Sequence, residues 1–166
     1  MKSALKIVIP VILTALISCG DTSEKKKPGF TYENKTTLES GATAASEELP
    51  PSKTIDLTNK GVGPISNIIL DAQINTELAK QGEDIFKSTC TACHRTDKKF
   101  IGPAPKDILN RRTPEWVMNM ILSPNKMVKD DPLAKALLEE YHGSPMPVQI
   151  NSKEEARALL EYFRTL

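Results

Sequence analysis

The sequence predicts an all-α domain, and three observations support this fold class. Between residues 75 and 166, four segments repeat apolar residues at the three- and four-residue spacing of an amphipathic helix. Each segment begins at a residue that commonly caps a helix N-terminus. No segment combines strand-like alternation with a hairpin signal.

The first two predicted helices begin at Asn75 and at Thr113-Pro114, where a capping side chain precedes the first turn. Ser123-Pro124 is expected to end the second helix. The first helix presents Leu78, Gly82, Ile85, Phe86 and Thr89 on one face, and the second presents Trp116, Val117, Met120 and Ile121.

The third predicted helix begins at Asp131-Pro132 and ends before Gly143. The last begins with the capping-box pattern Ser152-Lys153-Glu154-Glu155. Its apolar stripe consists of Ala156, Leu159, Leu160, Phe163 and Leu166.

Residues 1–18 are expected to form an export signal, because Lys2 and Lys6 precede an apolar run too short to cross a membrane. The following Cys19 ends a segment that resembles the lipobox of bacterial lipoproteins. That resemblance implies cleavage before Cys19, its lipidation and a membrane anchor. Residues 19–53 then form a flexible polar linker, and residues 54–74 an extended lead-in to a domain over 75–166.

The composition excludes several classes of protein. A hydrophobic fraction of 39% and a charged fraction of 26% fit neither a disordered chain nor a protein with many membrane spans. The formal net charge of +1 gives no support for nucleic-acid binding. Any electrostatic attraction to a partner must therefore come from local patches.

The motif Cys90-Thr91-Ala92-Cys93-His94 is typical of c-type haem attachment. Two thiols three residues apart can form thioethers with the two vinyl groups of one haem, and the adjacent His94 can then bind the iron. A thioredoxin-like redox pair is an alternative, but it requires a βαβ context. A zinc site of Cys90, Cys93, His94 and His142 is another, although adjacent ligands suit a tetrahedron poorly.

Gly82, Phe86 and the haem motif together resemble the N-terminal helix of class I cytochromes c. The resemblance implies that Gly82 lets this helix cross the C-terminal helix closely. It also implies that Phe86 meets an aromatic partner, for which Tyr162 and Phe163 are candidates. The implied fold is a cytochrome c-like helical domain around one covalently attached haem c with its iron.

A further feature extends the resemblance. Gly102-Pro103 follows the motif as in the family, which implies that the Pro103 carbonyl accepts the ring N–H of His94. The segment over 104–142 matches the family less clearly. Within it, Trp116 is a candidate to pack beside the haem or to bond a propionate through its ring N–H, or it is an ordinary core residue.

The second axial ligand is expected to be Met146, because Met146-Pro147 shortly before the last helix resembles the family's distal ligand. His142 is the main rival, and Met127, read as a loop residue, or an open site are others. Met118 and Met120 are expected to be core residues of a helix.

A hexacoordinate haem leaves no position for a substrate, so the sequence predicts an electron carrier rather than an enzyme. The alternative is a haem enzyme or gas sensor with an open distal site. Basic residues after the motif are candidates to steer an acidic partner: Arg95, Lys98, Lys99, Lys106, Arg111 and Arg112, against Asp97 and Asp107.

We expect a monomer on the outer or periplasmic face of a bacterial membrane, with respiratory proteins as electron donor and acceptor. Candidate acceptors are a terminal oxidase and a nitrogen-oxide reductase such as nitrous oxide reductase, because residues 116–120 and the lead-in resemble those of lipoprotein cytochromes that accompany the latter.

Overall fold

The computed structural model describes residues 49–166, and these residues form a helical domain. Its helices are α1 (Thr76–Ile85), α2 (Pro114–Leu122), α3 (Pro124–Asp130), α4 (Pro132–Glu140) and α5 (Lys153–Phe163). A π-helical turn (Phe86–Cys90) extends α1, and a 3₁₀ turn (Ile108–Asn110) precedes α2. The described residues include no strand, only an isolated parallel bridge between Asp56 and Arg112, which confirms the predicted all-α class.

The predicted caps form the helix starts. The side chain of Asn75 accepts a hydrogen bond from the Leu78 amide at 2.9 Å. Thr113 accepts from the Trp116 amide at 3.1 Å, and Ser152 accepts from Glu155 at 3.2 Å. Because these bonds satisfy amides that have no partner within the helix, short local signals determine where the helices begin.

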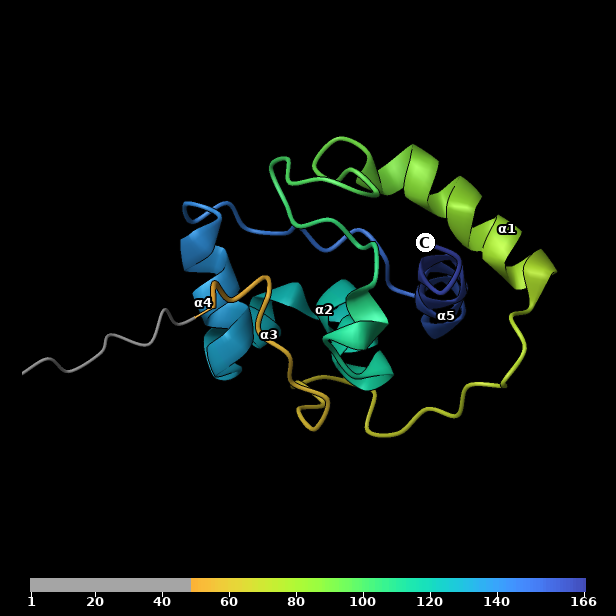
Figure 1. Ribbon diagram of the computed structural model, residues 1–166, viewed down its shortest axis with the longest axis horizontal. Coiled ribbons are helices and arrows are strands. Elements are labelled where there is room, and N and C mark those ends of the chain that lie inside the picture. The colour runs from red at the N-terminus through yellow and green to blue at the C-terminus, as the bar shows by residue number, and fades with distance from the viewer. Residues whose placement is uncertain (1–48) are drawn as a thin grey trace, which may run out of the picture. The chain divides into compact units, whose positions relative to one another are not determined.

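Helix α1 crosses α5, which Figure 1 shows end-on beneath it. A Cβ atom at Gly82 would lie 2.0 Å from the carbonyl oxygen of Ala158, so the two backbones approach more closely than any side chain allows. Phe86 packs beside this crossing, with its ring centroid 5.6 Å from that of Tyr162 and 5.9 Å from that of Phe163. This crossing places the end of α1 over the core.

The prediction that Met127 lies in a loop is wrong, because Pro124 begins α3. Pro124 both prevents α2 from continuing and occupies the first turn of the next helix, where its missing N–H has no consequence. Met127 is fully buried within α3, and its sulfur accepts the Val62 amide at 3.0 Å.

The segment before α1 runs along the lower edge of the domain in Figure 1, from the α4 side to α1. Asn119 anchors its middle, since its side chain accepts from the Ile65 amide at 2.9 Å and donates to the Ile65 carbonyl at 2.8 Å. Near its end, the Asn75 amide donates to the buried carboxylate of Glu161 at 2.8 Å. These contacts hold the segment against α2 and α5.

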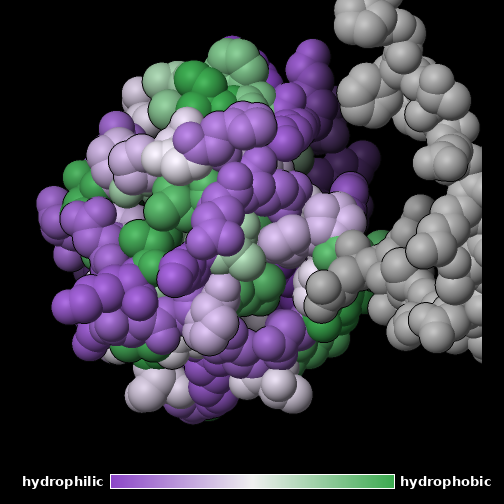
Figure 2. Space-filling view, turned by 90° about the vertical axis from the view of Figure 1, so that its left-hand side faces the viewer, coloured by the Kyte–Doolittle hydropathy of each residue, from purple (hydrophilic) through white to green (hydrophobic). Residues whose placement is uncertain are grey.

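Polar residues surround separate apolar patches on the face of the domain in Figure 2, the side where α4 lies. Among the described residues, no helix is both long enough and apolar enough to cross a membrane. Cys19 and the expected signal and linker before residue 49 lie outside the described part of the chain.

Candidate functional site

The cysteine motif begins at the end of the π-helical turn that continues α1. Cys90 is the last residue of the π-helical turn. Its carbonyl accepts the amides of Cys93 at 3.1 Å and His94 at 2.9 Å. This tight turn places all three side chains of Cys90, Cys93 and His94 on the wall of one cavity.

The two cysteine thiols are free and half-buried. Burial, with a smaller contribution from Cys93, raises the pKa of the Cys90 thiol to about 11. Without a cofactor, Cys90 is therefore a neutral thiol near pH 7 and not a reactive thiolate of the thioredoxin type.

The ring of His94 is fixed by the segment that follows the motif. Its Nδ1 atom lies 2.7 Å from the carbonyl oxygen of Pro103. A carbonyl can only accept, so Nδ1 carries the proton and Nε2 presents its lone pair. The Gly102 amide donates to the Cys93 carbonyl at 2.8 Å, and a Cβ atom at Gly102 would lie 2.5 Å from the imidazole ring.

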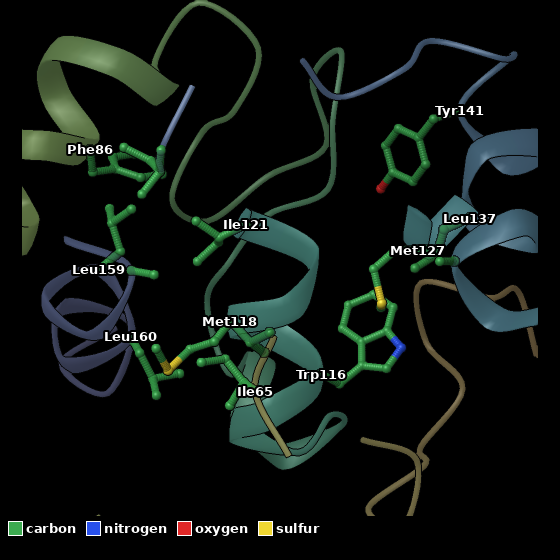
Figure 3. Close-up of a cluster of buried hydrophobic side chains, with 14 residues drawn as sticks. Ile65, Phe86, Trp116, Met118, Ile121, Met127, Leu137, Tyr141, Leu159 and Leu160 are labelled. Atoms are coloured by element: carbon green, nitrogen blue, oxygen red, sulfur yellow. The ribbon is translucent and has the colours of Figure 1, made fainter. Parts of the chain in front are cut away.

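Two adjoining cavities occupy the centre of the domain, and His94 and Met146 line both. Figure 3 shows Phe86 and Leu159 on one side of the core and Leu137 and Tyr141 on the other. The first pair lines one cavity and the second pair lines the other. The residues shared by both walls are Thr89, Cys90, His94, Pro103, Ile108, Trp116, Met120, Met146 and Gln149.

The candidates for the second ligand lie in different surroundings. Met146 is half-buried on the cavity wall, in the irregular segment before α5. His142 is exposed, has a left-handed backbone (φ 57°) and is absent from the cavity wall. Met118 is a core residue as expected, whereas Met120 is half-buried and lines both cavities.

Trp116 lines both cavities and is only 4% exposed. Its ring N–H donates to Asp131 at 3.2 Å. Asp131 is itself buried, and it also accepts from the Asn59 side chain and the Ala134 amide, each at 2.7 Å. Trp116 can therefore pack beside a cofactor. Its ring N–H already has an acceptor in Asp131, so it is not free to bond a propionate.

The basic residues after the motif differ in accessibility. Lys98, Lys99 and Lys106 are exposed. Arg95 is half-buried, and its guanidinium stacks 4.0 Å from the centroid of the Phe100 ring. Arg112 is 1% exposed, which excludes it from a surface that steers a partner.

Arg111 and Arg112 both line the larger cavity, and sequence reasoning missed this role. Their Nε atoms are buried without a hydrogen-bond partner in the described residues. Nothing in the sequence separates them from the neighbouring basic residues. Buried unpaired N–H groups on a cavity wall indicate an acceptor that belongs to a bound group.

The zinc interpretation has no support, since residues 49–166 contain no cluster of three or more His, Cys, Asp and Glu side chains suited to a metal ion. The cavity wall offers instead two thiols, an imidazole nitrogen, a thioether and apolar surface. This set suits a flat, largely apolar cofactor with a central metal and acidic substituents.

Residues 79–166 match the family model of cytochrome c. The chain is 32% identical to cytochrome c-551 of Pseudomonas denitrificans over 91 residues, which are 51% of this chain and 96% of that protein. It is 33% identical to cytochrome c-551 of Stutzerimonas stutzeri, over 54% of this chain and 80% of that protein. Among solved structures, cytochrome c of Rhodothermus marinus matches with a TM-score of 0.60 and 48% identity, over 62% of this chain and 88% of that one.

Proposed function

The chain belongs to the cytochrome c family and carries one covalently bound haem c, and we propose that Cys90, Cys93, His94 and Met146 hold this haem. The cysteines would form the two thioethers, and His94 and Met146 would be the axial ligands. The protein is an electron carrier, and when bound the haem supplies an iron atom that alternates between ferric and ferrous states.

The observation that carries this assignment is that His94 and Met146 line the same two cavities. Met120 also lines both, but it lies within helix α2, whereas Met146 lies in the irregular segment before α5. The bond from His94 Nδ1 to Pro103 leaves Nε2 as the donor atom for iron. The same bond makes His94 a more basic ligand and restricts rotation of its ring. The thioether of Met146 is a weaker donor that favours the reduced state.

The residues present fit a haem in two further respects. The walls beside the ligands are apolar, which excludes water and keeps rearrangement on electron transfer small. The unpaired Nε atoms of Arg111 and Arg112 would meet the carboxylates of the haem propionates. The protein thus contributes ligands, a dry pocket and compensation for the propionate charge.

The alternative function is a haem enzyme or gas sensor with an open distal site. Carbon monoxide distinguishes it from an electron carrier, because an iron with six ligands binds the gas only after one ligand leaves. We expect the reduced protein to bind carbon monoxide slowly and weakly. Rapid, tight binding by the wild-type protein would support the open site.

The covalent link is tested on protein made with haem-maturation machinery. We expect the wild-type protein to retain haem on a denaturing gel, and the Cys90→Ala, Cys93→Ala double variant to lose it. Wild-type haem that dissociates on denaturation would contradict the thioether assignment.

We further propose that Cys19 carries a lipid and that the residues between Cys19 and Leu49 tether the domain to a membrane of the bacterial cell envelope. The expected linker over 19–53 is shortened at its end, because Pro51 and Ser52 bond to Arg112 and Glu140. Metabolic labelling with a fatty acid tests this. We expect label in the wild-type protein and none in the Cys19→Ala variant, and label that persists in the variant would contradict the proposal.

The proposed partners are respiratory donor and acceptor proteins that dock on exposed Lys98, Lys99 and Lys106 near the haem motif. A terminal oxidase or a nitrogen-oxide reductase such as nitrous oxide reductase would accept the electron. If charge steers docking, the association rate should fall with ionic strength and with Lys→Gln substitutions at these positions. An association rate that depends neither on ionic strength nor on these substitutions would exclude this surface as the docking site.

A further inference from the structure

Arg112 is a buried cation surrounded by neutral acceptors. It is 1% exposed. Its terminal nitrogens donate to the Pro51 carbonyl at 2.6 Å, to the Arg111 carbonyl at 2.8 Å and to the Thr54 carbonyl. Within the described residues it forms no ion pair, and its Nε has no partner. Three carboxylates are near enough to interact with its charge but do not pair with it directly: those of Asp56, Asp131 and Glu140. A direct anionic partner for Nε would therefore have to come from a bound group.

Two of these acceptors belong to the segment before α1, which lies outside the residues that match the family model. We define residues 49–62 as the strap. The strap bridges the domain at Arg112, where the Asp56 amide donates to the Arg111 carbonyl at 2.9 Å. Its backbone carbonyls therefore hold the terminal nitrogens of the guanidinium.

The strap is itself anchored between these carbonyls and beyond them. Between them, the amide and hydroxyl of Ser52 donate to the two carboxylate oxygens of Glu140, at 2.7 and 2.6 Å. Beyond Thr54, Thr113 donates to the Asn59 carbonyl at 2.6 Å, and the Asn59 side chain donates to Asp131 at 2.7 Å. Ser52 also lines the larger cavity.

We propose that the strap is a positioning element for the haem, because its carbonyls at Pro51 and Thr54 aim Arg112 Nε at a haem propionate. This inference rests on the proposed function, since it requires haem in the cavity that Arg112 lines. Arg112 binds the propionate carboxylate, and the strap acts through Arg112. The strap thereby supplies part of the haem pocket from outside the family domain.

A fixed cation at the propionate has two measurable consequences. It opposes the added positive charge of ferric iron, which raises the reduction potential. It also favours the ionised propionate, which lowers the propionate pKa. Where the propionate loses its proton, the potential falls as pH rises, because the new negative charge stabilises ferric iron.

The test is a double-mutant cycle on the full-length haem protein, with potentials measured by spectroelectrochemical titration across pH. We expect Arg112→Gln to lower the potential and to move its pH-dependent fall to higher pH. Arg112→Lys keeps the charge but not the Nε donor, so its potential should lie between those of the wild type and of Arg112→Gln. Ser52→Ala removes the hydroxyl bond from the strap to Glu140 without changing charge and should lower the potential, whereas Ser66→Ala, an exposed substitution beyond the strap, should not.

The coupling between the Ser52 and Arg112 substitutions decides whether the strap acts through Arg112. In the Arg112→Gln background, Ser52→Ala should produce no further shift. An equal shift in both backgrounds would overturn the proposal, as would an Arg112→Gln protein with the potential and pH profile of the wild type. Failure of the axial-ligand assignment is distinguishable, because it would appear in the spectrum of the wild-type protein before any comparison of potentials.

Discussion

The Nδ1 atom of His94 lies 2.7 Å from the carbonyl oxygen of Pro103, and Gly102 leaves the space that this contact needs. Three consecutive features of the chain thus orient one imidazole. The Gly102 amide donates to the Cys93 carbonyl, the absence of a side chain at Gly102 leaves room for the ring, and the Pro103 carbonyl accepts the ring N–H.

Gly102→Ala should weaken this orientation, since the new Cβ would lie 2.5 Å from the imidazole. The loop must move, and a longer bond to Pro103 makes His94 a weaker donor, which raises the reduction potential. We also expect a loss of about 1–3 kcal/mol in the free energy of unfolding. Pro103→Ala retains the carbonyl and is the matched comparison. A larger change in potential for Pro103→Ala than for Gly102→Ala would contradict this account.

Gly82→Ala should separate α1 from α5, because its Cβ would lie 2.0 Å from a backbone oxygen that cannot rotate away. Overpacking of a core typically costs about 1–3 kcal/mol, and contact with backbone favours the upper part of that range. Chemical denaturation measures the loss. Gln81→Ala, at an exposed position of the same helix, is the control and should leave stability nearly unchanged. Equal midpoints for the two variants would show that the crossing tolerates a methyl group.

Glu161 should make the domain sensitive to acid. Burial raises the pKa of its carboxyl, but hydrogen bonds from the Asn75 amide and the Arg157 and Arg164 side chains outweigh burial and hold the pKa below 4.5. A lowered pKa in the folded state contributes stability above the unfolded pKa, and this contribution is lost as pH falls through the folded pKa. Glu161→Gln should therefore cost a few kcal/mol at pH 7 (about 3–5 is typical when a buried pair is broken) and less at pH 3. A cost that does not depend on pH would contradict this role.

Local signals predicted much of the fold. Asn75, Thr113 and Ser152 each cap a helix within three residues, so nearby sequence was sufficient to locate the starts of α1, α2 and α5. Ser123-Pro124 ends α2 as predicted, but Pro124 also begins α3, because the same residue is compatible with the end of one helix and the beginning of another. The resemblance to class I cytochromes c anticipated the aromatic contacts of Phe86 and the bond from His94 to Pro103.

Contacts between residues far apart in the sequence could not be predicted from local patterns. Arg112 was grouped with exposed basic residues, because its partners at Pro51 and Thr54 lie more than fifty positions earlier. The N–H of Trp116 was assigned to a cofactor or to none, because no local pattern indicates Asp131 as its acceptor. Both contacts involve buried polar groups, whose partners depend on how the strap and α3 pack.

The most direct test of the proposed site is the absorption spectrum of the oxidised protein in the far red, where methionine-ligated ferric haem has a weak band. We expect the wild-type protein to show this band, and Met146→Ala to lose it and to bind carbon monoxide readily when reduced. His142→Ala, at an exposed position, and Met127→Leu, in the core, should both retain it. A Met146→Ala protein that keeps this band would contradict the account and would make Met120, which also lines both cavities, the leading candidate for the second ligand.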